Sequence, residues 1–457
     1  MIASDRQGLV QGQVIEITIA SLSATGDGVG RYGEQVIFVP DTVPGDRVAV
    51  RLLQVKPRYA HAQIETLLIP SPDRVRPPCI VADKCGGCQW QPVSYAQQLA
   101  AKQAQVSEAL ERIGKFKHPP VAPILAAPSP LAYRNKVTYP LRQVNHRVQA
   151  GYYRKGSHRL VNLNQCPVQD DRLNPLLADV KQDLQQRGWP IYDEHTHRGL
   201  LRHLSLRVGR RTGEILLTLV TTDWQLPDFK AQAEEWLQRY PALVGVCLNR
   251  NPDRTNAIFG CETRCIAGRP VLTEQFAGLE FEIGSETFFQ VYTEQAERLV
   301  QILLERLQLQ GTERIVDAYC GIGTLSLPIA RQAQQVIGLE IHPATVAQAK
   351  QNAIRNGLTN VSFYAGPVEQ QLPQLDLLPD IVVLDPPRKG CDRSVVEHLS
   401  QLRPPRIVYM SCNPATLARD LHLLCQANPY ELEQIQPADF FPQTAHVETL
   451  AFLRLAT

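Results

Sequence analysis

The chain has 457 residues, 44% of them hydrophobic, with 47 Lys and Arg residues against 45 Asp and Glu residues. This length and apolar content supply several domain cores, which excludes a small disulfide-stapled scaffold. The balanced charges exclude the composition of a disordered or collagen-like chain, so we expect a globular protein of several domains.

The N-terminal region, residues 1–68, is expected to form a small all-β barrel. Its short runs rich in β-branched residues, 13–18, 36–39 and 47–51, are separated by Gly-Asp-Gly and Pro-Gly turns. Several prolines between residues 70 and 78 then mark a linker into the next region.

The middle of the chain, residues 69–283, is expected to be an α+β region. Ser94 can cap a helix that ends at Gly114, because the apolar residues between them recur at helical spacing. The other side of this helix, mostly Gln and Lys, is expected to face solvent. The helix is also a candidate to pack on the C-terminal domain. A strand-like run at 213–220 lies between two helical segments, around 172–188 and 226–239.

The C-terminal region, residues 284–457, is expected to be a doubly wound, Rossmann-like α/β domain. Short continuous apolar runs in this region predict the strands of a parallel sheet that is buried on both faces. A helix that begins at Pro343 and ends at Gly357 lies between the second and third strands. The predicted strands are 315–317, 336–340, 381–385 and 407–410.

Basic residues are concentrated between residues 76 and 166, where 13 Lys and Arg residues stand against three acids, a net charge of +10. Residues 131–160 hold seven basic residues and no acid. Basic side chains neutralise phosphates and aromatic rings stack on unpaired bases, so this stretch is a candidate nucleic-acid surface. Solvated faces of β-strands are the alternative interpretation. The interleaved tyrosines are Tyr133, Tyr139, Tyr152 and Tyr153.

Ligands of a doubly wound sheet bind at the carboxyl ends of its strands. The first strand is followed by Tyr319-Cys320-Gly321-Ile322-Gly323-Thr324, whose glycines let the backbone approach a ligand closely. Glu340 ends the second strand, where a carboxylate can accept hydrogen bonds from both hydroxyls of a ribose. A Gly-x-Gly loop favours S-adenosyl-L-methionine over a dinucleotide, which typically needs G-x-G-x-x-G for its pyrophosphate. The alternative is that Glu340 only caps the following helix.

Two prolines follow the acidic residue at the end of the third strand, in Asp385-Pro386-Pro387-Arg388. They hold the chain extended and aim the Asp385 carboxylate into the crevice. Amino-methyltransferases place an aromatic residue after a similar Pro-Pro pair. Arg388 at that place argues against an exocyclic amine as the methyl acceptor.

The fourth strand ends in Ser411-Cys412-Asn413-Pro414, which sets a thiol in the same crevice. Carbon 5 of uracil becomes nucleophilic only after a group adds to carbon 6, and a thiolate suits this addition because it is also a good leaving group. A base must then remove the proton from carbon 5, and Glu448 in His446-Val447-Glu448 is the candidate. An inert buried cysteine and a surface carboxylate are the alternative interpretations.

These motifs resemble those of the RNA uracil-5-methyltransferases, a family that includes bacterial ribosomal enzymes and the tRNA m5U54 enzyme. Phe288-Phe289-Gln290-Val291 and the motifs above occur in the family's order, and the resemblance spans nearly the whole chain. It implies that Cys412 is the nucleophile and Glu448 the base. It also implies a set of residues around S-adenosyl-L-methionine: Gln290, Tyr319, Thr324, Glu340 and Asp385.

The resemblance extends to the N-terminal barrel, which is similar to the TRAM domain, an OB-like RNA-binding module. The family's RNA-facing Tyr-Arg-Asn-Lys stretch corresponds to residues 133–136. Two positions depart from the family. Thr324 stands where relatives often carry Asn, and Pro367 stands where ribosomal enzymes tend to have Asn or Asp near the adenine, so only a backbone contact is expected from Pro367.

No run of about 18 apolar residues indicates a membrane span, and the chain lacks the apolar stretch of a secretory signal near its start. We therefore expect a cytoplasmic protein with no membrane partner. The 11 cysteines should then stay reduced, so that clusters of them are expected to bind metal or to take part in catalysis.

Cys79, Cys85 and Cys88 form a C-x5-C-x2-C cluster that indicates metal ligation. Cys166, which precedes a proline, is the candidate fourth ligand. Spacing alone does not separate zinc from an iron-sulfur cluster, since both accept four thiolates. The resemblance to the ribosomal enzymes implies a [4Fe-4S] cluster, and hence a central iron-sulfur domain. The alternatives for the fourth ligand are Cys247, Cys261 and Cys265.

We therefore expect an RNA (uracil-5-)-methyltransferase that acts on one uridine of structured RNA through a covalent Cys412 adduct. Its expected partner is 23S ribosomal RNA, with no DNA partner. U54 of tRNA is the alternative substrate for the same chemistry. A noncatalytic RNA-binding factor is the alternative from another class, and the intact Cys412 and Glu448 argue against it.

Overall fold

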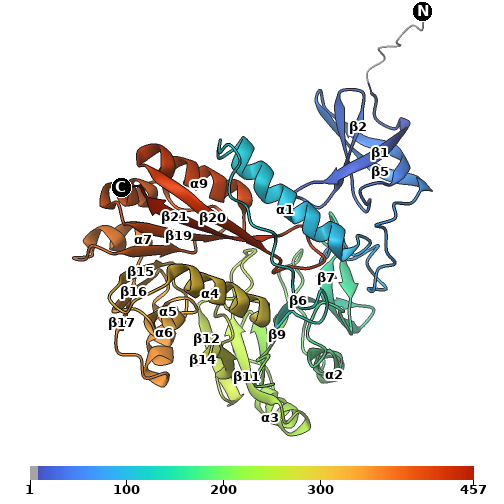
Figure 1. Cartoon of the computed structure of the whole chain (residues 1–457). Coiled ribbons are helices and arrows are strands. Elements are labelled where there is room, and N and C mark those ends of the chain that lie inside the picture. Colours follow the sequence, from blue (N-terminus) through green and yellow to red (C-terminus); the bar gives the residue numbers. More distant parts are fainter. Residues whose placement is uncertain (1–8, 457) are drawn as a thin grey trace, which may run out of the picture.

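The computed structural model describes residues 9–456 of the chain. A barrel, a central region and a C-terminal α/β domain follow one another in this part of the sequence (Figure 1). The first eight residues of the predicted N-terminal domain lie outside the described residues.

The N-terminal barrel is closed by five strands in the order β1-β2-β3-β5-β4. Buried residues alternate with exposed ones along most of β1, as expected for a strand with one face toward a core. The core consists of aliphatic side chains from the strands, so the predicted all-β barrel is confirmed. The strands are β1 (Val14–Leu22), β2 (Gly28–Tyr32), β3 (Gln35–Val39), β4 (Arg47–Val55) and β5 (Tyr59–Ile69).

A long helix, α1 (Tyr95–Arg112), connects the barrel to the rest of the molecule (Figure 1). The side chain of Ser94 accepts a hydrogen bond from the Gln97 amide at 3.3 Å, which confirms Ser94 as the cap. Val106 and Leu110 of α1 are buried in a core that they share with the C-terminal domain. Helix α1 is thereby anchored on the C-terminal domain.

The central region is built around a seven-stranded sheet with the order β12-β11-β10-β9-β6-β7-β8. One face of this sheet packs against α2 (Leu173–Arg187) and α3 (Phe229–Arg239), around one continuous hydrophobic core. The strands are β6 (Lys136–Val144), β7 (Arg147–Tyr153), β8 (Leu160–Asn162), β9 (Leu201–Val208), β10 (Ile215–Thr221), β11 (Leu243–Arg250) and β12 (Glu262–Gly268).

The prediction of a central iron-sulfur domain is wrong. Among residues 9–456, no group of three or more His, Cys, Asp or Glu side chains is arranged to hold a metal ion. The central region is instead an α+β unit that is held together by its hydrophobic core.

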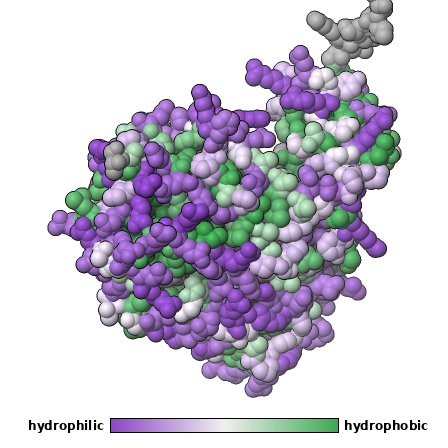
Figure 2. All heavy atoms as spheres, in the orientation of Figure 1, coloured by the Kyte–Doolittle hydropathy of each residue, from purple (hydrophilic) through white to green (hydrophobic). Residues whose placement is uncertain are grey.

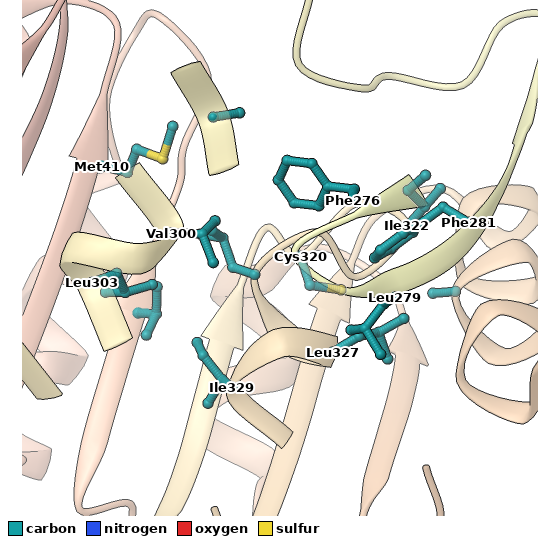
Figure 3. Close-up of a cluster of buried hydrophobic side chains, with 14 of the residues drawn as sticks. Phe276, Leu279, Phe281, Val300, Leu303, Cys320, Ile322, Leu327, Ile329 and Met410 are labelled. Carbon is teal, nitrogen blue, oxygen red and sulfur yellow. The ribbon is translucent and has the colours of Figure 1, made fainter. Parts of the chain in front are cut away.

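A hairpin and a helix join the central region to the C-terminal domain: β13 (Val271–Phe276), β14 (Leu279–Gly284) and α4 (Thr293–Leu307). They share one hydrophobic core with the first strands and loops of the C-terminal domain. Figure 3 shows the side chains that meet there, among them Phe276, Leu279, Phe281, Val300, Leu303, Ile322, Leu327 and Met410.

The C-terminal domain contains a second seven-stranded sheet, with the order β17-β16-β15-β18-β19-β21-β20, and its first five strands are parallel. Helices cover both faces, so the predicted doubly wound sheet is confirmed. Its strands are β15 (Arg314–Ala318), β16 (Gln335–Glu340), β17 (Val361–Ala365), β18 (Ile381–Leu384), β19 (Arg406–Ser411), β20 (Tyr430–Ala438) and β21 (Glu448–Leu455). Its helices are α5 (Ser326–Ala330), α6 (Pro343–Arg355), α7 (Val368–Gln371), the 3-10 turn η1 (Leu372–Gln374), α8 (Arg393–Leu402) and α9 (Pro414–Ala427).

Hydrophilic residues cover much of the face in Figure 2, with hydrophobic residues scattered between them. Within residues 9–456, no helix has the length and apolar character needed to cross a membrane.

Candidate active site

Three of the residues predicted around the cofactor lie at the carboxyl ends of neighbouring parallel strands. The last residue of β15 pairs with the residue before Glu340 in β16 and with the last residue of β18. Tyr319, Glu340 and Asp385 therefore lie next to one another along this edge of the sheet. A ligand of this fold binds at the same edge.

The loop after β15 is folded tightly by three left-handed residues. Tyr319, Gly321 and Gly323 have φ values of 70°, 56° and 89°. A Cβ atom at Gly323 would lie 2.9 Å from Leu327, so a side chain there would push the loop out of place. Tyr319 adopts this conformation without being glycine, which is uncommon and occurs most often where function requires it.

Glu340 is held in place by backbone donors. Its carboxylate accepts hydrogen bonds from the Gly321 amide at 3.2 Å and from the His342 amide at 2.9 Å. His342 is the residue before helix α6. Glu340 therefore contacts the start of this helix, as the alternative interpretation of Glu340 as a helix cap expects. Each carboxylate oxygen can accept more than one hydrogen bond, and the carboxylate therefore keeps acceptor capacity for a ribose.

Gln290 lies on a loop that the central region holds. The Asn135 side chain donates to the Gln290 carbonyl at 2.8 Å, and the Asn135 amide donates to the Val291 carbonyl at 2.9 Å. The Gln290 side chain then lines one cavity with Thr324 and Met410. Gln290, which precedes helix α4, and Thr324, which follows strand β15, therefore line the same cavity.

The thiol and the carboxyl proposed for catalysis face each other across two antiparallel strands. Ser411, the last residue of β19, pairs with Thr449 of β21. Cys412 and Glu448 are the next residues along this ladder, so they adjoin at the edge of the sheet where Asp385 also lies. Glu448 is buried, with 3% of its surface exposed, so the interpretation of Glu448 as a surface carboxylate is wrong.

The charges around this pair act on both groups. Burial raises the pKa of the Cys412 thiol, the neighbouring Glu448 raises it further, and Arg388 lowers it. Burial also raises the pKa of Glu448 well above its usual value, with Asp385 adding to the rise and Arg388 opposing it. A carboxyl group with a raised pKa is suited to accept a proton near neutral pH.

Asp385 has a raised pKa as well, of about 7, because it is buried and close to Asp317. Three titratable groups of the crevice, Cys412, Glu448 and Asp385, thus share a desolvated environment in which Arg388 is the cation that acts on the first two. Clusters of this kind are typical of catalytic sites.

Contacts of both its side chain and its backbone hold Arg388 in place. One guanidinium nitrogen lies 3.0 Å from Nε2 and 3.1 Å from Nδ1 of His446. Burial and the charge of Arg388 lower the pKa of His446 to about 4, so the imidazole is neutral at neutral pH and can accept this contact. The Arg388 carbonyl accepts hydrogen bonds from Asn413 and Thr416 at 3.1 and 3.2 Å.

Helix α1 holds the segment that leads to Glu448. Lys102 forms a fully buried ion pair with Asp439 at 2.5 Å and donates to the Phe441 carbonyl at 3.0 Å. Gln98 exchanges two hydrogen bonds with Gln443, at 2.9 and 3.2 Å. The prediction that the Gln and Lys side of α1 faces solvent is therefore wrong for Gln98 and Lys102, which are buried.

The tyrosines of the basic stretch do not form one surface. Tyr133 and Tyr139 are buried, with 1% and 0% of their surface exposed, so the prediction that they stack on bases is wrong. Tyr133 stacks on Tyr292, with ring centroids 4.7 Å apart. Tyr152 is half-buried beside the cysteines, and Tyr153 is half-buried at the end of β7.

The four cysteines of the predicted cluster line a single cavity: Cys79, Cys85, Cys88 and Cys166. Much of the cavity wall is apolar, and burial raises the pKa of the Cys88 thiol to about 12. The thiols are therefore close in space without the arrangement of a metal site, and all four are free. The three alternative ligands lie outside this cavity: Cys247 and Cys265 pair between β11 and β12, and Cys261 is exposed.

The sequence resembles known proteins over its full length. Residues 270–455 match the family model of tRNA (uracil-5-)-methyltransferases, and residues 9–64 match that of the TRAM domain. An uncharacterized RNA methyltransferase of Nostoc sp. is 65% identical, covering 98% of this chain and 97% of the relative. Another, of Halalkalibacterium halodurans, is 40% identical, covering 97% of this chain and 98% of the relative.

The fold also resembles a solved structure, that of Pyrococcus abyssi tRNA (uracil-54, C5)-methyltransferase in complex with S-adenosyl-L-homocysteine. The TM-score is 0.76 at 26% sequence identity, and the match covers 96% of this chain and 100% of that one. With the TRAM barrel, the uracil-5-methyltransferase domain and relatives of high identity over the full length, the chain belongs to the RNA uracil-5-methyltransferase family and is a methyltransferase.

Proposed function

We propose that this enzyme methylates carbon 5 of one uridine in 23S ribosomal RNA through a covalent adduct with Cys412. The observation that carries the proposal is the placement of Cys412 against Glu448 across β19 and β21, beside Arg388. Methyl transfer to oxygen or nitrogen needs neither a thiol nor a base for a carbon-bound proton. Uracil C5 methylation needs both.

S-adenosyl-L-methionine is the methyl donor in this proposal. The crevice fits it, because the Glu340 carboxylate keeps acceptor capacity for a ribose. Gln290 and Thr324 line one cavity, and Asp385 and Tyr319 lie at the same edge of the sheet as Glu340. The Pyrococcus abyssi relative, which has the same fold, was crystallised with S-adenosyl-L-homocysteine.

The proposed reaction begins when the Cys412 thiolate adds to carbon 6 of a uridine that has left its stack. The electron pair of the 5,6 double bond makes carbon 5 nucleophilic, and carbon 5 takes the methyl group. Glu448 then removes the proton from carbon 5, the double bond re-forms, and the carbon–sulfur bond breaks to release Cys412. Arg388 assists by favouring the thiolate before addition.

Two RNAs are candidates for the substrate. We place 23S ribosomal RNA first, on the resemblance of the motifs to the ribosomal enzymes. U54 of tRNA is the second candidate, because the Pyrococcus abyssi relative with the same fold is a tRNA (uracil-54, C5)-methyltransferase. Both substrates imply that the enzyme works in the cytoplasm.

The test is a map of 5-methyluridine, by mass spectrometry, in ribosomal and transfer RNA from cells with and without this gene. We expect the modification to disappear from one ribosomal position and to return when the gene is restored. Loss in tRNA alone would replace the proposed substrate and keep the chemistry. Restoration by a Cys412→Ala gene would contradict the proposed mechanism.

A further inference from the structure

The central sheet has two faces of different character. Its apolar face, with Val137, Tyr139 and Leu141 of β6, packs on α2 and α3. Side chains alternate along a strand, so the residues between these belong to the opposite face. On that face Lys136 pairs with Arg207 of β9, and two further cross-strand pairs follow it. These are Thr138 with Ser205 and Pro140 with His203.

One end of this polar face contacts the active-site loop. Lys136 donates to the Ser285 carbonyl at 2.9 Å, and Arg207 donates to the Thr287 carbonyl at 2.5 Å, just before Gln290. From Lys136 the face continues along β6 to Arg142, a length of about 20 Å for a strand. The polar face therefore leads away from the catalytic crevice across the central sheet.

The other end of the polar face opens into a pocket. Its lining includes Arg142, Tyr153, His158, Tyr192, Arg202 and His203. Tyr153 and Tyr192 are half-buried, and the Arg202 guanidinium lies 4.8 Å from the centre of the Tyr192 ring. Arg142 is exposed and forms no ion pair with any residue in 9–456.

Two residues that line the pocket each carry a buried polar atom without a hydrogen-bond partner within the described chain: Nε of Arg202 and Nδ1 of His203. A buried polar atom without a partner is destabilising unless water or a ligand supplies one. The rim adds the acceptors Asp193 and Glu194. The pocket thus combines aromatic rings, a free cation, and both donors and acceptors.

The pocket also lies beside the N-terminal barrel. Lys155, two residues after Tyr153, forms an ion pair with Asp41 of the barrel. Figure 1 shows β7 between the barrel and the strands β6 and β9, with the catalytic domain beyond them. The Lys155–Asp41 ion pair thus places the pocket on the barrel side of the central sheet.

We propose that this pocket binds one unpaired nucleotide of the RNA substrate, outside the target uridine, with its phosphate at Arg142 and its base against Tyr153 and Tyr192. The inference rests on the proposed function as an RNA methyltransferase. Aromatic rings stack on any base, and carboxylates such as Asp193 and Glu194 accept hydrogen bonds from the amino groups of bases. The pocket extends recognition to a nucleotide on the barrel side of the target.

The first test compares Arg142→Glu with a matched control, Arg306→Glu, in the full-length protein. Arg306 is also an exposed arginine, in the last turn of α4 and outside the pocket. The probe is a fluorescein-labelled single-stranded RNA of mixed sequence, and its anisotropy reports binding over a range of salt concentrations. We expect Arg142→Glu to weaken binding about tenfold and to lower the salt slope by about one, while Arg306→Glu binds as the wild type does.

The second test is ultraviolet cross-linking of the wild-type enzyme to the same probe, followed by peptide mass spectrometry. We expect cross-linked nucleotides on Tyr153 or Tyr192. With RNA from cells that lack the gene, Arg142→Glu should raise KM for methyl transfer and leave kcat unchanged.

The outcomes separate this inference from the proposed function. If Arg142→Glu binds and methylates RNA as the wild type does, the pocket is not an RNA site and the proposed function stands. If the wild type binds a matched duplex as well as the single strand, the inference of an unpaired nucleotide is wrong. If the wild type neither binds RNA nor methylates it, the proposed function fails, and the inference fails with it.

Discussion

Two parts of this molecule hold partly buried cysteine thiols, and they differ in the groups around those thiols. In the central cavity the thiols lie close to one another with Arg134 in the same cavity wall, and burial raises the pKa of Cys88 to about 12. In the catalytic crevice burial also raises the pKa of Cys412, but Arg388 opposes the rise. A cation is therefore present near the thiols in both places, and what distinguishes Cys412 is its position beside Glu448 at the edge of the sheet where ligands bind.

The first prediction concerns the nucleophile. Cys412→Ala should abolish methyl transfer to RNA, because no other group of the crevice can add to carbon 6 and leave again. RNA binding should persist, since the substitution removes one sulfur atom. A filter-binding assay and transfer of labelled methyl groups check both results. A Cys412→Ala enzyme with full activity would contradict the account.

The second prediction concerns the base. Glu448→Gln should allow the Cys412 adduct and the methylation of carbon 5, but not the removal of the proton that releases the RNA. A protein–RNA complex that resists denaturant should then accumulate on a gel, and the double variant Cys412→Ala/Glu448→Gln should not form it. Normal turnover by Glu448→Gln would show that another group is the base.

The third prediction concerns Arg388, the cation beside Cys412. Arg388→Gln removes the cation that lowers the pKa of Cys412, so the thiol should become harder to ionise. Below the new pKa the thiolate fraction falls about tenfold for each unit of the shift, so activity at neutral pH should fall and recover as the pH is raised. Arg388→Lys should shift the profile less.

The pH dependence of kcat/KM, measured from pH 6 to pH 10, checks this prediction. The contribution of Arg388 to the pKa of Glu448 has the same sign, so removal of Arg388 moves both titrations to higher pH. A profile of Arg388→Gln with unchanged shape and position would contradict the role of Arg388 as the activating cation.

The fourth prediction concerns stability. Lys102→Met leaves Asp439 as a buried charge without its cation and should lower the free energy of unfolding by about 3–5 kcal/mol. The double variant Lys102→Met/Asp439→Leu should recover most of this loss, because it removes both charges. Urea unfolding followed by fluorescence measures both. Equal stabilities for the two variants would show that the pair does not act as a unit.

The smallest effect is expected in the central cavity. Cys88→Ala should change methyl transfer per folded molecule by less than about threefold, because the Cys88 thiol has a pKa of about 12 and lies outside the crevice. The same transfer assay that tests Cys412→Ala provides the measurement. A loss as large as that of Cys412→Ala would show that the two sites are functionally linked.

Sequence periodicity predicted the barrel, the capped helix α1 and the parallel sheet, because these features depend on residues close together in the chain. It also predicted that Tyr319, Glu340 and Asp385 meet at one edge of the sheet, since the carboxyl ends of parallel strands lie there. Their individual roles stay predictions.

Features that join distant parts of the chain were not predicted. Lys102 and Asp439 are 337 residues apart in the sequence, and nothing local marks either as buried. Tyr133 and Tyr139 fit an exposed basic strand equally well until the tertiary contacts bury them. The cysteine spacing correctly indicated proximity, but proximity does not fix the positions of ligands around a metal.

The central claim is that methyl transfer occurs at carbon 5 of uracil through addition of Cys412. It is tested most directly with RNA that carries tritium at carbon 5 of its uridines, taken from cells that lack the gene. We predict that the wild-type enzyme releases one tritium to water for each methyl group transferred, and that Cys412→Ala releases none. Methyl incorporation without tritium release would contradict the account.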